Sequence, residues 1–310
     1  MPVLAVEAAY LFGGFVLGFF TSPVFLEVWR YFYAARVVGM LFGVAAIPLL
    51  YLIGKELLDR RAGLLAALFL TFYPTHLARS HEGTPYTAQL FFALLSFLFI
   101  GRIYKRGKTR DYVLAGLCAG FATAIQYNVL FLFGPLSLAH FLRGAQRGHR
   151  LRESLVAGSL YLGLLSVGIG FLIGNPYVVA DFGRFVDAMS VHFRKFSVVS
   201  GFSFAPATAD ATRSGLVTTL LGNSGTYLRQ MSASRDMGLP AFVLCIGGMA
   251  YGLCKRARAS SLAPALFLPT WLLVSWYSTH QVPYLLPVIA LSYLPAAWLL
   301  VTIADTATAR

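Results

Sequence analysis

The chain has 310 residues, of which 58% are hydrophobic and only 12% are charged. Its mean hydropathy of +0.70 is far above that of a water-soluble domain, since soluble domains average about 25% charged and 45–50% apolar residues. This composition excludes a soluble enzyme, a disordered protein and a disulfide-stapled secreted domain. It indicates an integral membrane protein.

The net charge of +13 comes from short basic patches that alternate with loops nearly free of Lys and Arg. Such alternation is the positive-inside bias, and it predicts that the patches face the cytoplasm and anionic membrane lipid. We expect no nucleic-acid partner. The patches are Lys55/Arg60/Arg61, Arg102 to Arg110, Arg143/Arg147/Arg150/Arg152, Lys255/Arg256/Arg258 and Arg310.

Hydropathy predicts an all-α, polytopic transmembrane bundle of about nine to ten spans, because a crossing needs roughly 20 apolar residues. The first segment carries Glu7 and is also compatible with a helix lying along the membrane surface. Residues 1–310 are expected to form a single transmembrane domain. The segments are 3–20, 34–54, 62–78, 86–101, 112–126, 129–142, 154–174, 239–254, 262–279 and 284–304.

Two further features concern the connections and the helix shapes. The 175–238 stretch is expected to be a long extracytoplasmic loop with short interfacial helices, since loops of that length are usually functional. Prolines within the predicted helices are expected to kink them. These prolines are Pro48, Pro74, Pro135, Pro269, Pro287 and Pro295.

The most concentrated polar cluster of the outer side runs from Arg79 to Tyr86 and includes His81 and Glu82. Ionisable groups near hydrocarbon are costly and usually face a cavity or a partner. Glu82 could accept a proton from a substrate hydroxyl. The alternative is an ion pair of Glu82 with Arg79 or His81 that only stabilises the fold. The other carboxylates available on this side are Glu27, Asp181, Asp187, Asp210 and Asp236.

Two more polar groups lie at predicted outer turns. Gln126, Tyr127 and Asn128 separate two short hydrophobic segments, and we expect them to line a cavity. His280 and Tyr284 flank the last outer turn, where they could bind substrate or belong to the aromatic belt of the membrane interface. The three cysteines lack the paired spacing of a zinc site, so no metal site or cofactor is predicted, and a need for a divalent metal stays open.

The order of these motifs resembles the GT-C superfamily of polytopic glycosyltransferases, in the branch of protein O-mannosyltransferases and aminoarabinose transferases. Ser80 to Tyr86 looks like a mixture of two outer-loop motifs of that branch, Ser-Arg-Glu-Ala-Arg-Pro-Tyr and Ser-His-Tyr-Ala-Thr-Thr-Asp. The resemblance extends from about residue 20 to residue 304. It also rests on Ala35 to Gly39, Pro48 to Lys55, Asp59 to Ala67, Asp111 to Leu117, Gln126-Tyr127-Asn128, Gly174-Asn175-Pro176-Tyr177 with Asp181-Phe182, and Tyr284-Leu285-Leu286-Pro287.

The resemblance implies an inverting enzyme that moves a sugar from a polyprenyl-phosphate carrier to an acceptor at the extracytoplasmic face. It implies Glu82 as the catalytic carboxylate, and membrane lipid and the lipid-linked donor as partners; sugar and acceptor are not specified. A bacterial cytoplasmic membrane is the expected location. The residues implied in substrate binding are Arg79, His81, Tyr86, Gln126, Tyr127, Asn128, Asn175, Tyr177, His280 and Tyr284.

The sequence also departs from the family pattern. It is expected to lack the family's first helix and first acidic loop, the usual Lys is Gln126, and the usual late Arg is Pro283. These departures favour an alternative, a non-catalytic or truncated relative that binds a lipid-linked sugar or a partner subunit. A transporter is a third alternative, but the inverted repeats typical of transporters are not seen.

Overall fold

The computed structural model describes residues 28–187, 190, 222, 224–233, 236–255, 262–276 and 282–308, and within them the chain is helical without strands. This confirms the predicted all-α class. The elements are α2 (Val28–Leu57), α3 (Arg60–Phe72), α4 (Pro74–His81), α5 (Tyr86–Lys105), α6 (Thr109–Ile125), the 3-10 helix η1 (Tyr127–Leu132), α7 (Phe133–Gln146), α8 (Leu151–Val156), α9 (Gly158–Gly174), α10 (Tyr177–Ala180), α13 (Leu239–Cys254), α14 (Leu262–Trp276), the 3-10 helix η3 (Val282–Leu285) and α15 (Leu286–Thr308).

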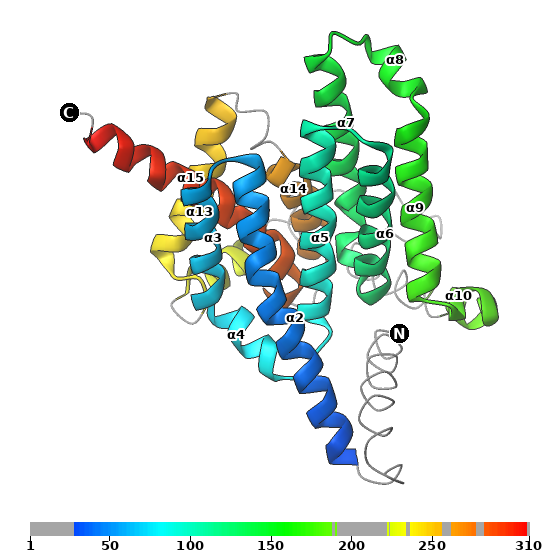
Figure 1. Cartoon of the computed structure of the whole chain (residues 1–310). Helices are drawn as coiled ribbons and strands as arrows, with labels where there is room; N and C mark the ends of the chain where they lie inside the picture. The colour runs from blue at the N-terminus through cyan, green and yellow to red at the C-terminus, as the bar shows by residue number, and fades with distance from the viewer. Residues whose placement is uncertain are drawn as a thin grey trace, which may run out of the picture.

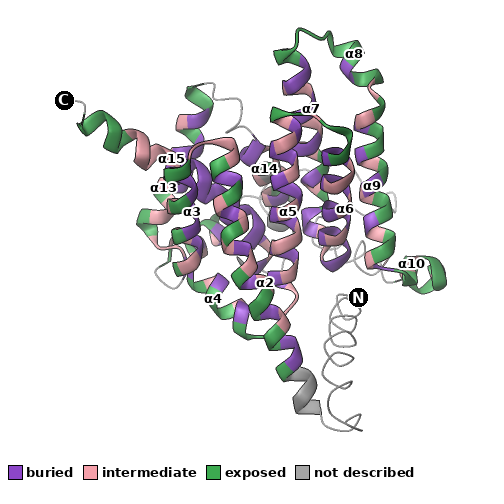
Figure 2. Cartoon of the chain, viewed as in Figure 1, coloured by how far each residue is buried: buried purple, intermediate pink, exposed green. Residues whose placement is uncertain are grey.

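The long helices pack side by side in one bundle, with α5 at its centre and α9 and α13 toward its edges (Figure 1). Three described helical segments are long and apolar enough to cross a membrane, namely Tyr33–Leu57, Tyr86–Lys105 and Pro283–Thr308, and three shorter apolar segments accompany them. Buried residues line the centre of the bundle, whereas α9 is exposed along its outer side (Figure 2). Such a distribution suits an integral membrane protein whose outer helices contact lipid. The total of nine to ten spans stays a prediction.

The predicted segment 62–78 is two helices. Tyr73 has an extended backbone (φ −69°, ψ 115°), and Pro74 begins α4 as its first residue. Proline disfavours a helical conformation at the preceding residue but fits the first helical position. The interpretation of Pro74 as a kink within a continuous helix was therefore wrong. Pro48, Pro269 and Pro295 do lie inside helices, as predicted.

Small residues bring α6 and α9 into close contact. A Cβ atom on Gly116 would lie 2.2 Å from the carbonyl oxygen of Gly163, and one on Gly120 would lie 2.3 Å from that of Val167. A glycine of α9 approaches α6 in the same way: a Cβ atom on Gly170 would lie 2.3 Å from the carbonyl oxygen of Leu117. Without a hydrophobic driving force between helices in lipid, such backbone approach supplies much of the packing energy.

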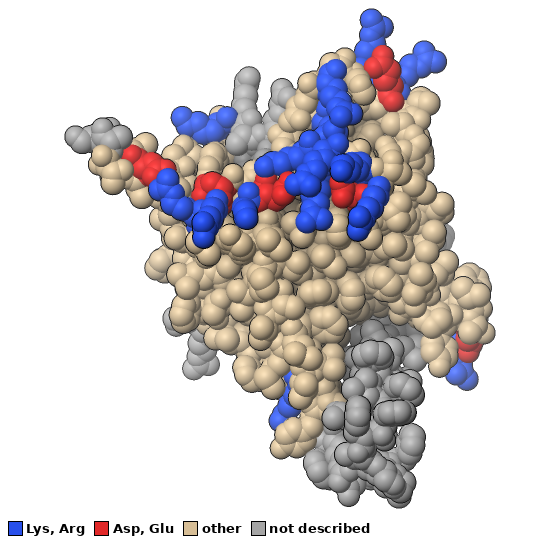
Figure 3. Space-filling view, viewed as in Figure 1, with Lys and Arg blue, Asp and Glu red and all other residues tan. Residues whose placement is uncertain are grey.

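The basic residues gather at one end of the bundle. Figure 3 shows Lys and Arg side chains in a band over one end, with a largely uncharged zone beneath it. Lys55 lies in the last turn of α2, and Arg102 and Lys105 lie in the last turn of α5. Arg61 pairs with Asp305 at 2.8 Å and Arg106 with Glu56 at 3.3 Å. The α4 helix lies toward the opposite end (Figure 1), and η3 contacts α4. This end is extracytoplasmic if the band faces the cytoplasm.

Replacing Gly120 by Ala tests the α6–α9 packing. The added methyl group cannot fit against Val167, so we expect the variant to lose about 1–3 kcal/mol of stability, the usual cost of overpacking. Gly168→Ala on α9 is the matched control, because a Cβ atom there meets nothing within 4 Å. Thermal unfolding in detergent measures both variants, and equal melting temperatures would contradict the close contact.

Cysteine labelling tests the orientation. In a Cys254→Ser background, which removes the exposed native thiol, we expect Thr109→Cys to react with a membrane-impermeant maleimide only from the cytoplasmic side. Tyr177→Cys on α10 should react only from the outside. Labelling of position 109 from outside in intact cells would overturn the predicted topology.

Candidate active site

The α4 helix and the turn after it place the predicted polar cluster at the end of the bundle opposite the basic band. Glu82 caps the C-terminus of α4. Gly83 has φ of +66°, a left-handed conformation that costs glycine little. A Cβ atom on Gly83 would also lie 3.2 Å from that of Ala35 on α2. Glycine at this position therefore lets the chain reverse tightly against α2 and enter α5.

Three side chains of the cluster and Tyr284 of η3 form a continuous series of contacts. The Arg79 guanidinium donates to the Glu82 carboxylate, and both side chains remain partly exposed. The same guanidinium lies 5.4 Å from the centre of the Tyr86 ring. The Tyr86 ring meets that of Tyr284 edge-on at 5.9 Å. Glu82 thus forms the ion pair with Arg79 that the sequence left open as an alternative to catalysis. Two tyrosines predicted to bind substrate, Tyr86 and Tyr284, lie next to this pair. His81 is exposed, and its Nδ1 lies 2.7 Å from the carbonyl oxygen of Leu77.

Asn128 joins three elements beneath this cluster. Its amide oxygen accepts a hydrogen bond from Gln89 of α5, and its amide nitrogen donates to the backbone oxygen of Tyr284 in η3. Gln89 also reaches the backbone oxygen of Gln126 at 3.4 Å, where α6 ends. Asn128 and Gln89 are both buried. Gln89 was not among the predicted residues, although its position one helical turn after Tyr86 was a usable signal.

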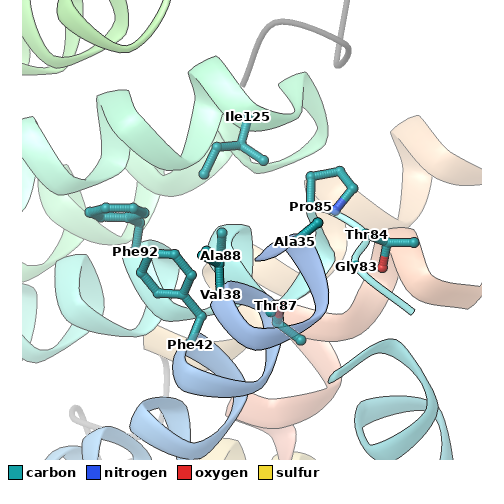
Figure 4. A pocket seen from close by; sticks show the side chains of 11 residues that line it. Ala35, Val38, Phe42, Gly83, Thr84, Pro85, Thr87, Ala88, Phe92 and Ile125 are labelled. Carbon is teal, nitrogen blue, oxygen red and sulfur yellow. The ribbon is translucent and has the colours of Figure 1, made fainter. Parts of the chain in front are cut away.

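A cavity of about 160 Å³ lies directly behind the turn (Figure 4). Its walls come from α2, from the turn that follows Glu82, from α5 and from the end of α6. Ile125 lines the cavity, rather than Gln126 to Asn128 as predicted from the sequence. The lining residues are Ala35, Val38, Gly39, Phe42, Gly83, Thr84, Pro85, Thr87, Ala88, Phe92 and Ile125.

The remaining predicted residues lie on the α9 side or outside the described part of the chain. Tyr127 packs its ring on Phe171 of α9 at 6.2 Å. Asn175 caps the end of α9 and is buried, and Tyr177 on α10 is exposed. His280, like Glu27 and Asp210, lies outside the described residues.

Unlike the exposed Glu82, the carboxylate of Asp236 is buried next to α4. Asp236, which precedes α13, is 7% exposed and accepts a hydrogen bond from the Thr75 hydroxyl. Burial raises the pKa of Asp236, and the bond from Thr75 offsets part of that effect. The sequence placed Asp236 on the outer side without predicting its burial, because the contact joins residues 161 positions apart.

The described residues contain no group of three or more His, Cys, Asp and Glu side chains that could hold a metal ion. The side chains of Glu82, Arg79, Tyr86 and Tyr284 offer a carboxylate, a guanidinium and two phenolic hydroxyl groups.

The fold is similar to that of an oligosaccharyltransferase of known structure. The oligosaccharyltransferase of Archaeoglobus fulgidus matches 96% of this chain at 17% identity in its apo form, with a TM-score of 0.52. Its complex with zinc and sulfate matches 97% at 16% identity, with a TM-score of 0.55. A third structure of that protein, in complex with an inhibitory peptide and a dolichol-phosphate, matches 97% at 15% identity, with a TM-score of 0.52. The chain spans only 40–42% of the length of these proteins. The helical bundle thus has the fold of this oligosaccharyltransferase.

A family model narrows the class. Residues 17–173 match the model of dolichyl-phosphate-mannose-protein mannosyltransferases, which covers just over half of the sequence. The chain belongs to this family, and the predicted GT-C membership is confirmed. No protein of curated function matches the sequence significantly.

The burial of Asp236 predicts a pH-dependent stability. Because its folded pKa is raised, the folded state keeps a proton that the unfolded state has lost. Stability should therefore fall as pH rises from about 3.9, the ordinary Asp value, through the raised value. Asp236→Asn removes this dependence, so the melting temperature of the variant minus that of the wild type should increase between about pH 4.5 and pH 7.5.

Thermal unfolding in detergent at both pH values checks this expectation, and each 1 kcal/mol corresponds to about 2–4 °C. Asp181→Asn is the matched control, since Asp181 is partly exposed and pairs with Arg184 at 3.3 Å. If the melting-temperature difference between Asp236→Asn and the wild type were the same at both pH values, the conclusion that burial raises the pKa of Asp236 would be wrong.

Proposed function

We propose that this chain transfers a sugar from a polyprenyl-phosphate carrier to an acceptor hydroxyl at the extracytoplasmic face of a bacterial cytoplasmic membrane, with inversion at the anomeric carbon. The observation that carries the proposal is the placement of Glu82 and Arg79. A carboxylate and a cation lie side by side at the C-terminal end of α4, the helix that lies at the end of the bundle away from the basic band (Figure 1). The family membership and the GT-C fold support it.

The proposed chemistry uses both partners of the ion pair. The carrier's phosphate binds the Arg79 guanidinium, which releases the Glu82 carboxylate. Glu82 then takes the proton of the acceptor hydroxyl while the acceptor oxygen attacks the anomeric carbon. The bond from that carbon to the phosphate oxygen breaks on the opposite face, and Arg79 stabilises the charge of the departing polyprenyl phosphate. The Tyr86 ring holds Arg79 in position by its cation–π contact.

We propose mannose as the sugar and a protein hydroxyl as the acceptor. The name of the matching family specifies a dolichyl-phosphate-mannose donor and a protein acceptor. The A. fulgidus enzyme with the same fold has been captured with a dolichol-phosphate and a peptide. An amphiphilic donor suits a membrane bundle, because its tail can stay in hydrocarbon while its phosphate meets a cation at the rim.

A non-catalytic relative that binds the lipid-linked sugar is the second candidate. Glu82 is engaged by Arg79 in the structure, and Gln126 stands where the family usually has Lys. Losing a cation that neutralises phosphate weakens transition-state stabilisation more than binding. A non-catalytic relative would bind the lipid-linked sugar at the same site as the proposed enzyme but would not transfer it.

Replacing Glu82 by Gln tests the catalytic proposal. Removing the base while keeping its shape should lower transfer about 10²- to 10⁴-fold, the usual contribution of general base catalysis. The measurement uses proteoliposomes of the full chain, radiolabelled polyprenyl-phosphate mannose and peptides rich in Ser and Thr. Incorporation of label into peptide reports turnover.

The matched control is Glu56→Gln, which removes the ion pair with Arg106 at the basic end and should leave transfer unchanged. Equal turnover of Glu82→Gln and wild type would remove Glu82 from the mechanism. A wild-type chain that binds the donor without transferring sugar would favour the non-catalytic candidate.

A further inference from the structure

Part of the basic band lies over the ends of α5, α6 and α7 (Figures 1 and 3). We propose that Arg143 and Arg147, at the end of α7, bind the phosphate of an anionic phospholipid in the leaflet at this end of the bundle. That leaflet is the cytoplasmic one in the predicted orientation. The site lies at the end of the bundle opposite Glu82, so the inference does not depend on the proposed function.

Arg143 is the only Lys or Arg among the described residues that is buried. It is 9% exposed, whereas Arg147 and the neighbouring Lys105, Arg106 and Lys108 are exposed. Burial and the nearby charge of Arg147 lower the pKa of the Arg143 guanidinium, which still keeps its proton at neutral pH. A buried charge is costly unless an opposite charge pairs with it. An anion next to Arg143 would therefore be strongly favoured.

No acidic side chain in the described part of the chain supplies that anion. The ion pairs of these residues involve neither Arg143 nor Arg147. Asp111 in the first turn of α6 and Glu153 in α8 are the acidic residues of the neighbouring helices. Neither of them pairs with Arg143. Two guanidinium groups thus lie near each other without a carboxylate between them.

A structural role explains only part of this placement. The Nη1 atom of Arg143 donates to the backbone oxygen of Tyr104 in the last turn of α5, at 3.4 Å, a favourable position for a cation at a helix C-terminus. That contact uses one of the five N–H donors of a guanidinium. The Nε and Nη2 atoms form no hydrogen bond with the described residues and are not completely enclosed. A ligand at the surface can therefore reach them.

The surrounding helices fix the place of the Arg143 side chain. Gly107, in the turn after α5, has φ of +60°, and a Cβ atom there would lie only 2.1 Å from the Nε atom of Arg143. Glycine thus leaves room for the guanidinium. On the other side, the His140 ring lies 2.6 Å from the Tyr112 hydroxyl oxygen and 2.9 Å from the Ser154 backbone oxygen. These contacts join α6, α7 and α8 and hold the end of α7 in place.

A phosphodiester with a net negative charge suits this pair of cations. Arg147 follows Arg143 by about one helical turn, a spacing that brings Cβ atoms to within about 5–6 Å of each other. Phosphate oxygens between the two side chains can accept charge-assisted hydrogen bonds from both. The negative charge would also offset the repulsion between the two guanidinium groups.

The neighbouring surface favours a lipid over a soluble anion. The α9 helix packs against α6 and α7, and its outer side exposes apolar side chains such as Tyr161 and Leu165 (Figure 2). Acyl chains can cover this surface while the headgroup remains at the cations. Basic pockets between membrane helices on the cytoplasmic side are known to bind anionic headgroups.

Native mass spectrometry of the full chain in detergent tests this inference. The probes are phosphatidylglycerol, phosphatidylethanolamine as a phospholipid without net charge, and inorganic phosphate. We expect phosphatidylglycerol to bind at least about tenfold more tightly than phosphatidylethanolamine, because only the former keeps a net negative charge for the two guanidinium groups. An excess of inorganic phosphate should not displace the lipid. Displacement by inorganic phosphate would assign the site to a free anion and overturn the lipid assignment.

Two variants and a matched control locate the binding site. Arg147→Gln removes an exposed cation and should weaken phosphatidylglycerol binding about tenfold, the factor of one charge-assisted hydrogen bond. Arg143→Gln should weaken it at least as much. Arg60→Gln is the matched control, because it removes one charge from an exposed position of the same band, at the start of α3, and should leave binding unchanged. If Arg143→Gln does not fold, Arg147→Gln alone decides.

The outcomes separate a defined site from general attraction by the band. Unchanged binding in Arg147→Gln would overturn the inference. An equal loss in Arg60→Gln and Arg147→Gln would overturn it as well, since it would mean that the whole band attracts the lipid. Glu82→Gln should bind phosphatidylglycerol like the wild type, so loss of sugar transfer and loss of this lipid site can be told apart.

Discussion

The arrangement of the candidate site depends on the hydrogen bonds of one buried amide, that of Asn128. A helix in a membrane can be interrupted only where the freed polar groups find partners within the protein. The chain is interrupted after α6 and again at η3, and Asn128 binds Gln89 of α5 on one side and the Tyr284 backbone on the other. The Tyr284 ring then meets Tyr86, which in turn supports Arg79 beside Glu82. The uncharged amide of Asn128 thus helps to hold Tyr284, Tyr86 and Arg79 in place next to Glu82.

The distribution of charge gives the two ends of the bundle different tasks. The basic band contains ion pairs such as Arg61 with Asp305 and suits the surface of anionic lipid. Arg79 and Glu82 lie at the opposite end of the bundle, next to each other. In the proposed mechanism a lipid-linked anion would meet the Arg79 cation there, outside the basic band. The same separation makes orientation and catalysis parts of one hypothesis, since a reversed bundle would place Glu82 in the cytoplasm.

Much of the fold could be predicted from the sequence, because long apolar runs and basic patches are local signals. The predicted segments near 34–54, 86–101 and 239–254 match α2, α5 and α13. The break at Pro74 was misread, since proline within a membrane helix and proline at a helix start give the same local pattern. The Arg79 to Tyr86 cluster was predicted as a unit, being contiguous in sequence. Its connection through Gln89 and Asn128, and the burial of Asp236 against Thr75, arise from packing between distant segments.

The ion pair between Arg79 and Glu82 is compatible with catalysis because it is weak. Both side chains are partly exposed, and exposed ion pairs contribute only about 0–1 kcal/mol. A phosphate group that binds a guanidinium through two parallel hydrogen bonds gains more, since each charge-assisted bond contributes about 1.5–3 kcal/mol. The carrier can therefore displace Glu82 from Arg79 at small cost. In the proposed mechanism the ion pair occupies the Glu82 carboxylate before the donor binds, so the proposed base becomes available only when a phosphate is present.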